Sequence, residues 1–227
     1  WYLTAHYEKD ARLDYKLVID STHWILDPLN PNSCMSGFGP NSELRMPRNH
    51  VPAEVIYHTD IPHGKIVDTV YTSGARKNSR HVKLYLPAGY PEPGVAYPLI
   101  LFQDGIEFLS IGKADHVLDF LIAKKVIRPV IAIFVEPVER DDEYSGSKRK
   151  AYSRFITEEL MPDVDRKYQT SRHPSDRALA GISNGGNISL YIGISHPEHF
   201  GKISVQSSNV MPEIFTMLDN LNPKETV

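Results

Sequence analysis

The chain has 227 residues, 41% hydrophobic and 23% charged, which is the balance of an ordinary globular protein with one large domain or a medium domain and an appendage. Its formal net charge of −3 at pH 7 argues against a nucleic-acid-binding surface. Cys34 is the single cysteine, which excludes an intrachain disulfide and a multi-cysteine metal site. No apolar stretch is long enough to span a bilayer. Localisation stays open between the cytoplasm and a bacterial periplasm.

The first part of the chain has the pattern of short β-strands followed by a loop. Apolar and polar residues alternate in "WYLTAHY", "LDYKLVID" and "HWILDP", which is typical of half-exposed strands. The next stretch, "NPNSCMSGFGPNSELRMPRNHVP", is crowded with Pro, Gly, Asn and Ser, which favours a loop. We place a domain boundary near Pro47. Residues 1–46 hold too few strands for a good independent core, so we expect them either to pack on the rest of the protein or to be the remnant of a larger β-domain.

From Ala53 onward, antiparallel strand patterns give way to buried strands that alternate with helices. The strand patterns with alternating sides are "AEVIYHT", "KIVDTVYTS" and "RHVKLYLP". The buried runs are "YPLILFQD", "RPVIAIFVEP", "RALAGIS" and "GKISVQSS", and the helical patterns are "ADHVLDFLIAKK", "KAYSRFITEELMPDVDRKY" and "GNISLYIGISHP". This order predicts an α/β fold, with a mostly parallel sheet, helices on both faces and the antiparallel strands at one edge.

The stretch "GISNGG", residues 181–186, carries the clearest chemical signal. It matches G-x-S-x-G and lies between a buried strand and a helix, the setting of a nucleophile elbow. In such a turn Gly181 and Gly185 pass too close for side chains, and the helix N-terminus faces the oxyanion of acyl transfer. No lysine follows for a phosphate-binding P-loop, and the G-x-G-x-x-G spacing is absent. A plain surface turn is the remaining alternative to Ser183 as a nucleophile.

Two further loops follow buried strands and therefore fall at the same sheet edge as Ser183. Asp104-Gly105 ends one strand, and the N–H of Gly105 or Ile106 is the candidate second oxyanion donor. The alternative is a simple Asp-Gly turn into a helix. "EPVERDDEYSGS" follows the next strand and places Arg140 and Glu143 where they would touch substrate, although an exposed charged loop explains them equally well.

Taken together, five blocks in order resemble the putative esterase family, which includes esterase D, feruloyl esterases and enterochelin esterases. The blocks are "VKLYLPAGYPEPGVAYPLILFQDG", "ERDDEYSGS", "FITEELMPDVDRKY", "ALAGISNGGNISL" and "HPEHFGKISVQSS", and the resemblance covers residues 53–209. It implies an α/β-hydrolase fold for residues 47–227. The segment before it resembles the end of the immunoglobulin-like β-sandwich that enterochelin esterase-like members carry.

The resemblance also implies roles for individual residues. Ser183 matches the nucleophile of the family. Asn184 and the Gly105–Ile106 loop match its oxyanion hole, and Arg140 matches a position near its substrate pocket. With Asp104 and Glu143, Arg140 forms the set of candidate substrate contacts. The mechanism implied needs no cofactor and no metal.

The general base and acid of the triad are not evident. The fold's triad runs Ser, then Asp or Glu, then His, and only His196 and His199 follow Ser183. Both end the elbow's own helix, so we expect them far from the serine. His116 lies in an earlier helical pattern, and Glu213 and Asp219 follow no clear buried strand. We therefore expect a hydrolase domain that is incomplete at its C-terminus, with no histidine within hydrogen-bonding reach of Ser183.

These observations predict a serine esterase that acts on a small carboxylic ester such as a siderophore or a feruloyl or acetyl carbohydrate. The alternatives are a non-catalytic relic that binds carbohydrate or a siderophore, and an acyltransferase that uses the same serine. We expect a small-molecule ester as partner, with no nucleic acid and no membrane. A homodimer is compatible with the sequence.

Overall fold

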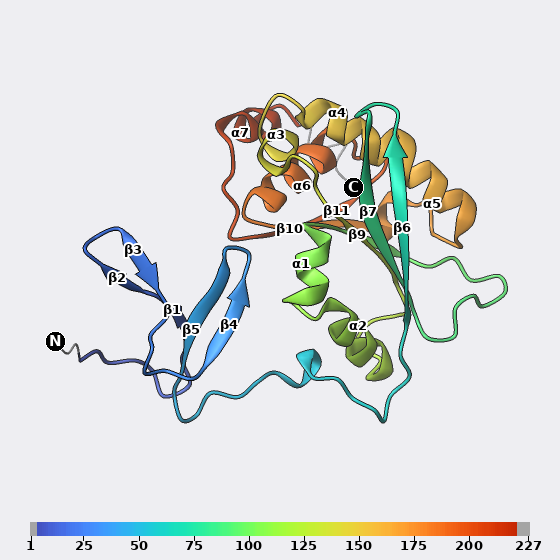
Figure 1. Ribbon diagram of the computed structural model, residues 1–227. Coiled ribbons are helices and arrows are strands. Elements are labelled where there is room, and N and C mark those ends of the chain that lie inside the picture. Colours follow the sequence, from blue (N-terminus) through green and yellow to red (C-terminus); the bar gives the residue numbers. More distant parts are fainter. Residues whose placement is uncertain (1–3, 222–227) are drawn as a thin grey trace. The chain divides into compact units, whose positions relative to one another are not determined.

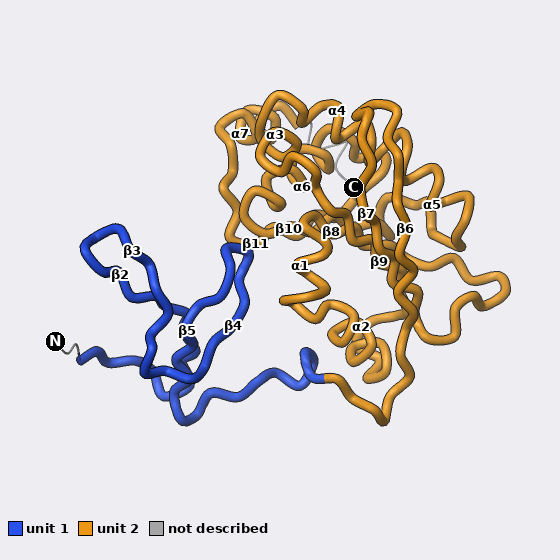
Figure 2. The backbone as a smooth tube through the Cα atoms, viewed as in Figure 1, with its two compact units in different colours: residues 1–56 blue, residues 57–227 orange. Residues whose placement is uncertain are grey.

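The structure is a computed structural model that describes residues 4–221 (Figure 1). It consists of two compact units, residues 1–56 and 57–227 (Figure 2). The division follows Ile56, nine residues after Pro47, near which the composition led us to place the boundary. None of the helices in residues 4–221 has both the length and the apolar character needed to cross a membrane.

The first unit contains short antiparallel strands. Strands β1 (Arg12–Tyr15), β5 (Gly39–Arg45) and β4 (Ser33–Ser36) form one sheet in that order, and β2 (Leu17–Ile19) pairs with β3 (His23–Ile25). The β4–β5 hairpin lies in the stretch predicted to be a loop. That prediction was wrong because turn residues mark hairpins as well as loops: the Ser36 hydroxyl bonds Gly39 O across the turn, at 2.8 Å. The predicted strand "WYLTAHY" begins outside the described residues, and its residues 4–7 form no strand.

The second unit is built on a six-stranded sheet with the order β11-β10-β8-β9-β7-β6. Its strands are β6 (Lys65–Ser73), β7 (Asn78–Leu86), β8 (Leu99–Gln103), β9 (Ile131–Val135), β10 (Arg177–Ile182) and β11 (Lys202–Gln206). The last four are parallel, and β7 and β6 continue the sheet in antiparallel fashion. The sequence prediction of a mostly parallel sheet with antiparallel strands at one edge is confirmed.

Helices cover both faces of this sheet. They are α1 (Gly105–Ser110), α2 (Ala114–Ala123), α3 (Arg140–Tyr144), α4 (Arg149–Arg154), the π-helical segment η2 (Phe155–Leu160), α5 (Met161–Lys167), α6 (Asn184–Ser195) and α7 (Pro212–Asp219), with 3-10 turns η1 (Ala53–Val55) and η3 (Pro174–Asp176). The pattern "AEVIYHT" forms η1 and a loop instead of a strand. The backbone N–H groups of Val55 and Ile56 donate to Pro52 O and Ala53 O within this turn, so they are not available to a neighbouring strand.

The sequence of β9 shows why both faces are covered. All five of its residues, "IAIFV", are fully buried. Ile133 and Val135 pack toward α4, η2 and α6, whereas Ala132 and Phe134 pack toward α1 and α2. A strand that is apolar at every position must sit between two layers, because successive side chains point to opposite faces.

A buried ion-pair cluster ties α3 to the sheet. The Glu143 carboxylate, with no exposed surface, accepts hydrogen bonds from both terminal nitrogens of Arg80 on β7, at 3.0 and 2.7 Å. It also accepts from Nε of Arg76 and from the backbone N–H of Val138. Burial alone would raise the pKa of Glu143, but the hydrogen bonds and charge of Arg80 outweigh it and hold the pKa below the ordinary 4.5.

Replacement of Glu143 by Gln should destabilise the fold by about 3–5 kcal/mol at pH 7, because Arg80 is left as an uncompensated buried cation. The lowered pKa of Glu143 contributes stability above its ordinary value of 4.5, and this contribution is lost as the pH falls through the folded-state pKa. The gap between wild type and Glu143→Gln should therefore narrow in acid. Urea unfolding of both proteins at pH 7 and at acidic pH measures this difference in the free energy of unfolding. Glu139→Gln, which alters a more exposed ion pair on the same segment, is the control and should change little. An equal gap at both pH values would contradict the assignment.

Candidate functional site

Ser183 occupies a strained turn between β10 and α6. Its backbone has φ 55° and ψ −124°, which is unusual for a residue with a side chain. The Ser183 N–H donates to Gln206 O at 3.0 Å, and its carbonyl accepts from the Ser208 hydroxyl at 2.9 Å. The residue is exposed, and its Oγ bonds to no other residue in 4–221. The main chain is thus held while the hydroxyl is left open to a ligand.

The glycines around Ser183 are required by close backbone packing. A Cβ at Gly181 would lie 2.1 Å from the Gly185 carbonyl oxygen, and a Cβ at Gly185 would lie 2.8 Å from Oδ2 of Asp104 and 3.3 Å from Cβ of Gln103. At Gly186 it would lie 2.8 Å from Cγ1 of Val205. An open surface turn would impose no such limits, so this turn is a packed elbow.

The loop after β8 lies against this elbow. Because β8 and β10 are parallel neighbours, Asp104-Gly105 and Ser183 follow the same edge of the sheet. Asp104 is held at φ 53° by helix α1, whose Glu107 N–H donates to Asp104 O at 3.0 Å. A Cβ at Gly105 would lie 2.3 Å from Cα of Phe134 on β9, which fixes the path of the loop.

Three backbone N–H groups at this edge are unused. Those of Gly105, Ile106 and Asn184 donate to no group within the described part of the chain. They are first-turn groups of α1 and α6, which have no acceptor inside their helices. Such free donors at helix N-termini favour a negatively charged oxygen.

The segment after β9 reaches both neighbouring loops. Nε and Nη2 of Arg140 each donate to the Asp104 carboxylate at 2.8 Å, and the hydrogen bond raises the pKa of Arg140. The Asn184 side chain donates to the Ser145 hydroxyl at 3.1 Å. The structure therefore brings Asp104, Arg140 and Asn184 together beside Ser183.

Glu143 is a correction to the sequence analysis. The sequence placed it with Arg140 as a candidate substrate contact, but its carboxylate is fully buried among Arg80, Arg76 and the Val138 N–H. Glu143 lies on the inner side of α3, which carries Arg140 and the exposed Asp141 as well. A group with no exposed surface cannot touch substrate, so its role is to anchor the helix.

Sequence reasoning missed Tyr144 and Asn187. The Tyr144 hydroxyl accepts from the Asp104 N–H at 3.0 Å, and the Asn187 side chain donates to Tyr144 O at 3.0 Å. Both residues are fully buried. For Tyr144 the sequence carried a weak indication: it lies four positions after Arg140, and residues at this spacing share one face of a helix.

No histidine in residues 4–221 bonds to the Ser183 hydroxyl. His196 follows α6, thirteen positions after Ser183, which is about 20 Å along a helix. Burial lowers the pKa of His199, and the charge of Arg177 at the start of β10 is a smaller cause in the same direction. The ring of His116 contacts Tyr57. Of the two acids considered, Glu213 pairs with Arg149 and Asp219 ends α7.

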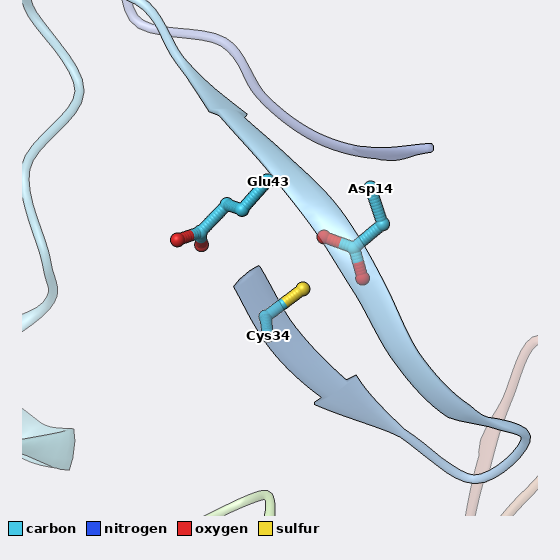
Figure 3. Close-up of side chains that lie close together, drawn as sticks. All are labelled: Asp14, Cys34 and Glu43. Carbon is cyan, nitrogen blue, oxygen red and sulfur yellow. The ribbon is translucent and has the colours of Figure 1, made fainter. Parts of the chain in front are cut away.

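One cluster in the first unit has the composition of a metal site. Asp14, Cys34 and Glu43 place ligand atoms within 4.8 Å of one another. Figure 3 shows the Asp14 and Cys34 side chains close together, with the Glu43 side chain extending away from them. Arg12 pairs with both carboxylates, and Arg45 also pairs with Glu43. The arginines already neutralise the two carboxylates, so the cluster has no excess negative charge to attract a cation.

Comparison with known proteins gives a family match over most of the second unit. The family described as "Putative esterase" matches residues 73–222. The iron(III) enterobactin esterase of Escherichia coli is 26% identical over 190 residues, which cover 82% of this chain and 46% of that protein. An endo-1,4-beta-xylanase/feruloyl esterase of Xylanibacter ruminicola is 28% identical over 170 residues, 69% of this chain and 23% of that protein. The chain thus spans less than half the length of these two relatives.

A solved structure agrees with the sequence matches. The enterobactin esterase FES from Shigella flexneri, crystallised in the presence of enterobactin, superposes with a TM-score of 0.67 at 26% identity. The match covers 82% of this chain and 48% of that one. This similarity confirms the predicted α/β-hydrolase fold.

Replacement of Gly181 by Ala should lower the free energy of unfolding by about 3 kcal/mol, because the new methyl group meets backbone atoms of Gly185 and Gly186 that cannot move aside. Thermal and urea unfolding measure the change. Gly74→Ala is the matched control, since the nearest atom to a Cβ there is 3.9 Å away. Equal stability of the two variants would show that the elbow is looser than the structure has it.

Proposed function

The chain belongs to the Putative esterase family, and on this basis we propose that it hydrolyses carboxylic esters with Ser183 as the nucleophile. The observation that carries the proposal is the elbow itself. The exposed Ser183, at a strained positive φ, lies at the same sheet edge as three N–H groups that have no acceptor within residues 4–221. Backbone strain at a polar residue is costly, and it typically persists where the strained group is used.

In the proposed mechanism, Ser183 Oγ attacks the ester carbonyl carbon and a tetrahedral oxyanion forms. The N–H of Asn184 and the N–H of Gly105 or Ile106 donate to that oxygen. The C–O bond to the alcohol then breaks, and the alcohol leaves with the proton that the Ser183 hydroxyl gave up, which yields an acyl-enzyme. Water then adds to the acyl carbon, the bond to Ser183 Oγ breaks, and Oγ takes a proton back as the acid is released. Fixed donors at two helix N-termini are suited to this task because they need no reorientation when the charge appears.

The relatives suggest which esters to test first. Their names describe an iron(III) enterobactin esterase and a feruloyl esterase. We therefore propose a siderophore ester of the enterobactin type or a feruloyl ester as substrate. An acetylated carbohydrate is a third choice on the same chemistry, and transfer of the acyl group to a sugar would use the same serine.

A second candidate function is binding without turnover, of a carbohydrate or a siderophore. The observation that favours it is that no histidine in the described residues bonds to Ser183 Oγ. In serine hydrolases that depend on a triad, loss of the histidine alone costs about 10⁶-fold in turnover. A fluorophosphonate probe separates the two functions, because it labels only an activated serine.

Replacement of Ser183 by Ala in the complete protein should reduce hydrolysis of p-nitrophenyl acetate and of a feruloyl ester by at least about 10³-fold, since no other group supplies the nucleophile. It should also abolish fluorophosphonate labelling and leave the melting temperature unchanged or raised. Ser195→Ala, at the exposed far end of the same helix, is the control. Activity that survives in Ser183→Ala would remove this residue from the mechanism, whereas a wild type that binds an ester without labelling would favour the second candidate.

A further inference from the structure

Helix α3 touches both segments that supply the proposed oxyanion donors. Toward the loop after β8, Arg140 holds the Asp104 carboxylate by two hydrogen bonds, and the Tyr144 hydroxyl accepts the Asp104 N–H. Asp104 directly precedes Gly105 and Ile106. The carboxylate, backbone N–H and backbone carbonyl of Asp104 are therefore all bonded, which restricts the backbone just before these two N–H groups.

Toward the elbow, the same short helix bonds α6. The Asn187 side chain donates to Tyr144 O at 3.0 Å, and the Asn184 side chain donates to the hydroxyl of Ser145, the residue after α3. Tyr144 thus joins the two segments through one residue: its hydroxyl faces Asp104 and its carbonyl faces Asn187. Its side chain is fully buried, so the link is shielded from water.

The helix is itself held in place. Glu143 binds Arg80 of β7 with both carboxylate oxygens and accepts the Val138 N–H. Strand β7 is part of the sheet from which the elbow and the loop after β8 also arise. Helix α3 is therefore anchored to the same sheet that carries Ser183.

Arg140 has few donors left for a ligand. Its Nε and Nη2 are the edge that would bind a carboxylate in bidentate fashion, and Asp104 occupies this edge. The guanidinium carbon lies 5.4 Å from the centre of the Tyr144 ring. The side chain is thus held between Asp104 and Tyr144 on its way to the surface.

We propose that α3 is a brace that sets the distance between the two oxyanion-donor segments, and that Arg140 is a positioning residue that acts through Asp104 instead of binding substrate. This inference rests on the proposed function. Oxyanion donors stabilise the transition state more than the bound ester, so loss of their alignment lowers kcat and leaves KM nearly unchanged.

The first test compares kinetics in the complete protein, with p-nitrophenyl acetate as substrate. Arg140→Gln and Tyr144→Phe should each lower kcat about 10- to 100-fold, with KM within about twofold of wild type, because displacement by a fraction of an ångström is enough to weaken an aligned donor. Arg140→Lys, which keeps one charged donor, should recover part of the loss. Arg154→Gln removes an exposed ion pair on α4 and is the control.

A double variant tests whether Arg140 acts through Asp104. Asn tolerates the positive φ of Asp104, so Asp104→Asn removes the charge without disturbing the backbone. If the two residues act as one unit, Arg140→Gln combined with Asp104→Asn should be no more than about threefold slower than the slower single variant. Fully multiplicative losses would overturn the proposal. So would a rise in KM for Arg140→Gln with unchanged kcat, which would make Arg140 a substrate contact.

Amide hydrogen exchange tests the brace without relying on turnover. Arg140→Gln and Tyr144→Phe should both speed exchange in peptides that cover residues 103–110, where the Asp104 N–H is bonded, and Arg154→Gln should not. Unchanged exchange and unchanged kcat in Arg140→Gln would reject the brace while Ser183 keeps its role. An inactive wild type would reject the proposed function, and the exchange result would still decide whether α3 holds the loop.

Discussion

The backbone contact between β10 and α6 is the constraint from which the rest of the candidate site follows. Gly181 and Gly185 approach so closely that neither can carry a Cβ atom without displacing its neighbour. The chain must therefore reverse at Ser183 alone, which takes a positive φ. A positive φ is energetically unfavourable for serine. The conformation is held by the hydrogen bond to Gln206 on the neighbouring strand and by the first turn of α6. The backbone N–H and carbonyl of Ser183 are bonded, and the residue is exposed.

Polar contacts and close backbone packing hold the loop after β8 beside this elbow. Gly105 packs on the backbone of β9, and Asp104 is bonded through its side chain and its main chain. Glu143 and Arg80 place a charged pair inside the protein, which costs desolvation energy and is stable only while both partners are present. Such a pair contributes little net stability compared with apolar packing, but it fixes a geometry. In our proposal, its position beneath α3 allows this short helix to hold the loop after β8 and helix α6 at a fixed distance from each other.

Several features were predictable because they depend on neighbours in the sequence. Runs such as "IAIFV" are apolar at every position, and only a strand between two layers satisfies that pattern. Other predictions failed where one residue pattern is compatible with two different structures. Gly, Ser and Asn in residues 30–45 build the β4–β5 hairpin as readily as a loop. "AEVIYHT" alternates as a strand should, but its first residues close a 3-10 turn at Ala53–Val55. The nucleophile and oxyanion roles remain predictions, now with a geometry that suits them.

Local sequence patterns were sufficient to predict the mostly parallel sheet, the elbow at Ser183 and the position of the loops after β8 and β9 at one edge of the sheet. These follow from local patterns and from the direction of parallel strands, so no long-range contact had to be known. The packing of the whole domain, in contrast, makes Glu143 an anchor, pairs Arg140 with Asp104 and lets Tyr144 join the loop after β8 to α6. Glu143 and Arg80 are 63 positions apart, and Arg140 and Asp104 are 36 apart. A charged residue has the same appearance in sequence whether it faces water or an opposite charge, because its partner is chosen by the packing of the whole domain.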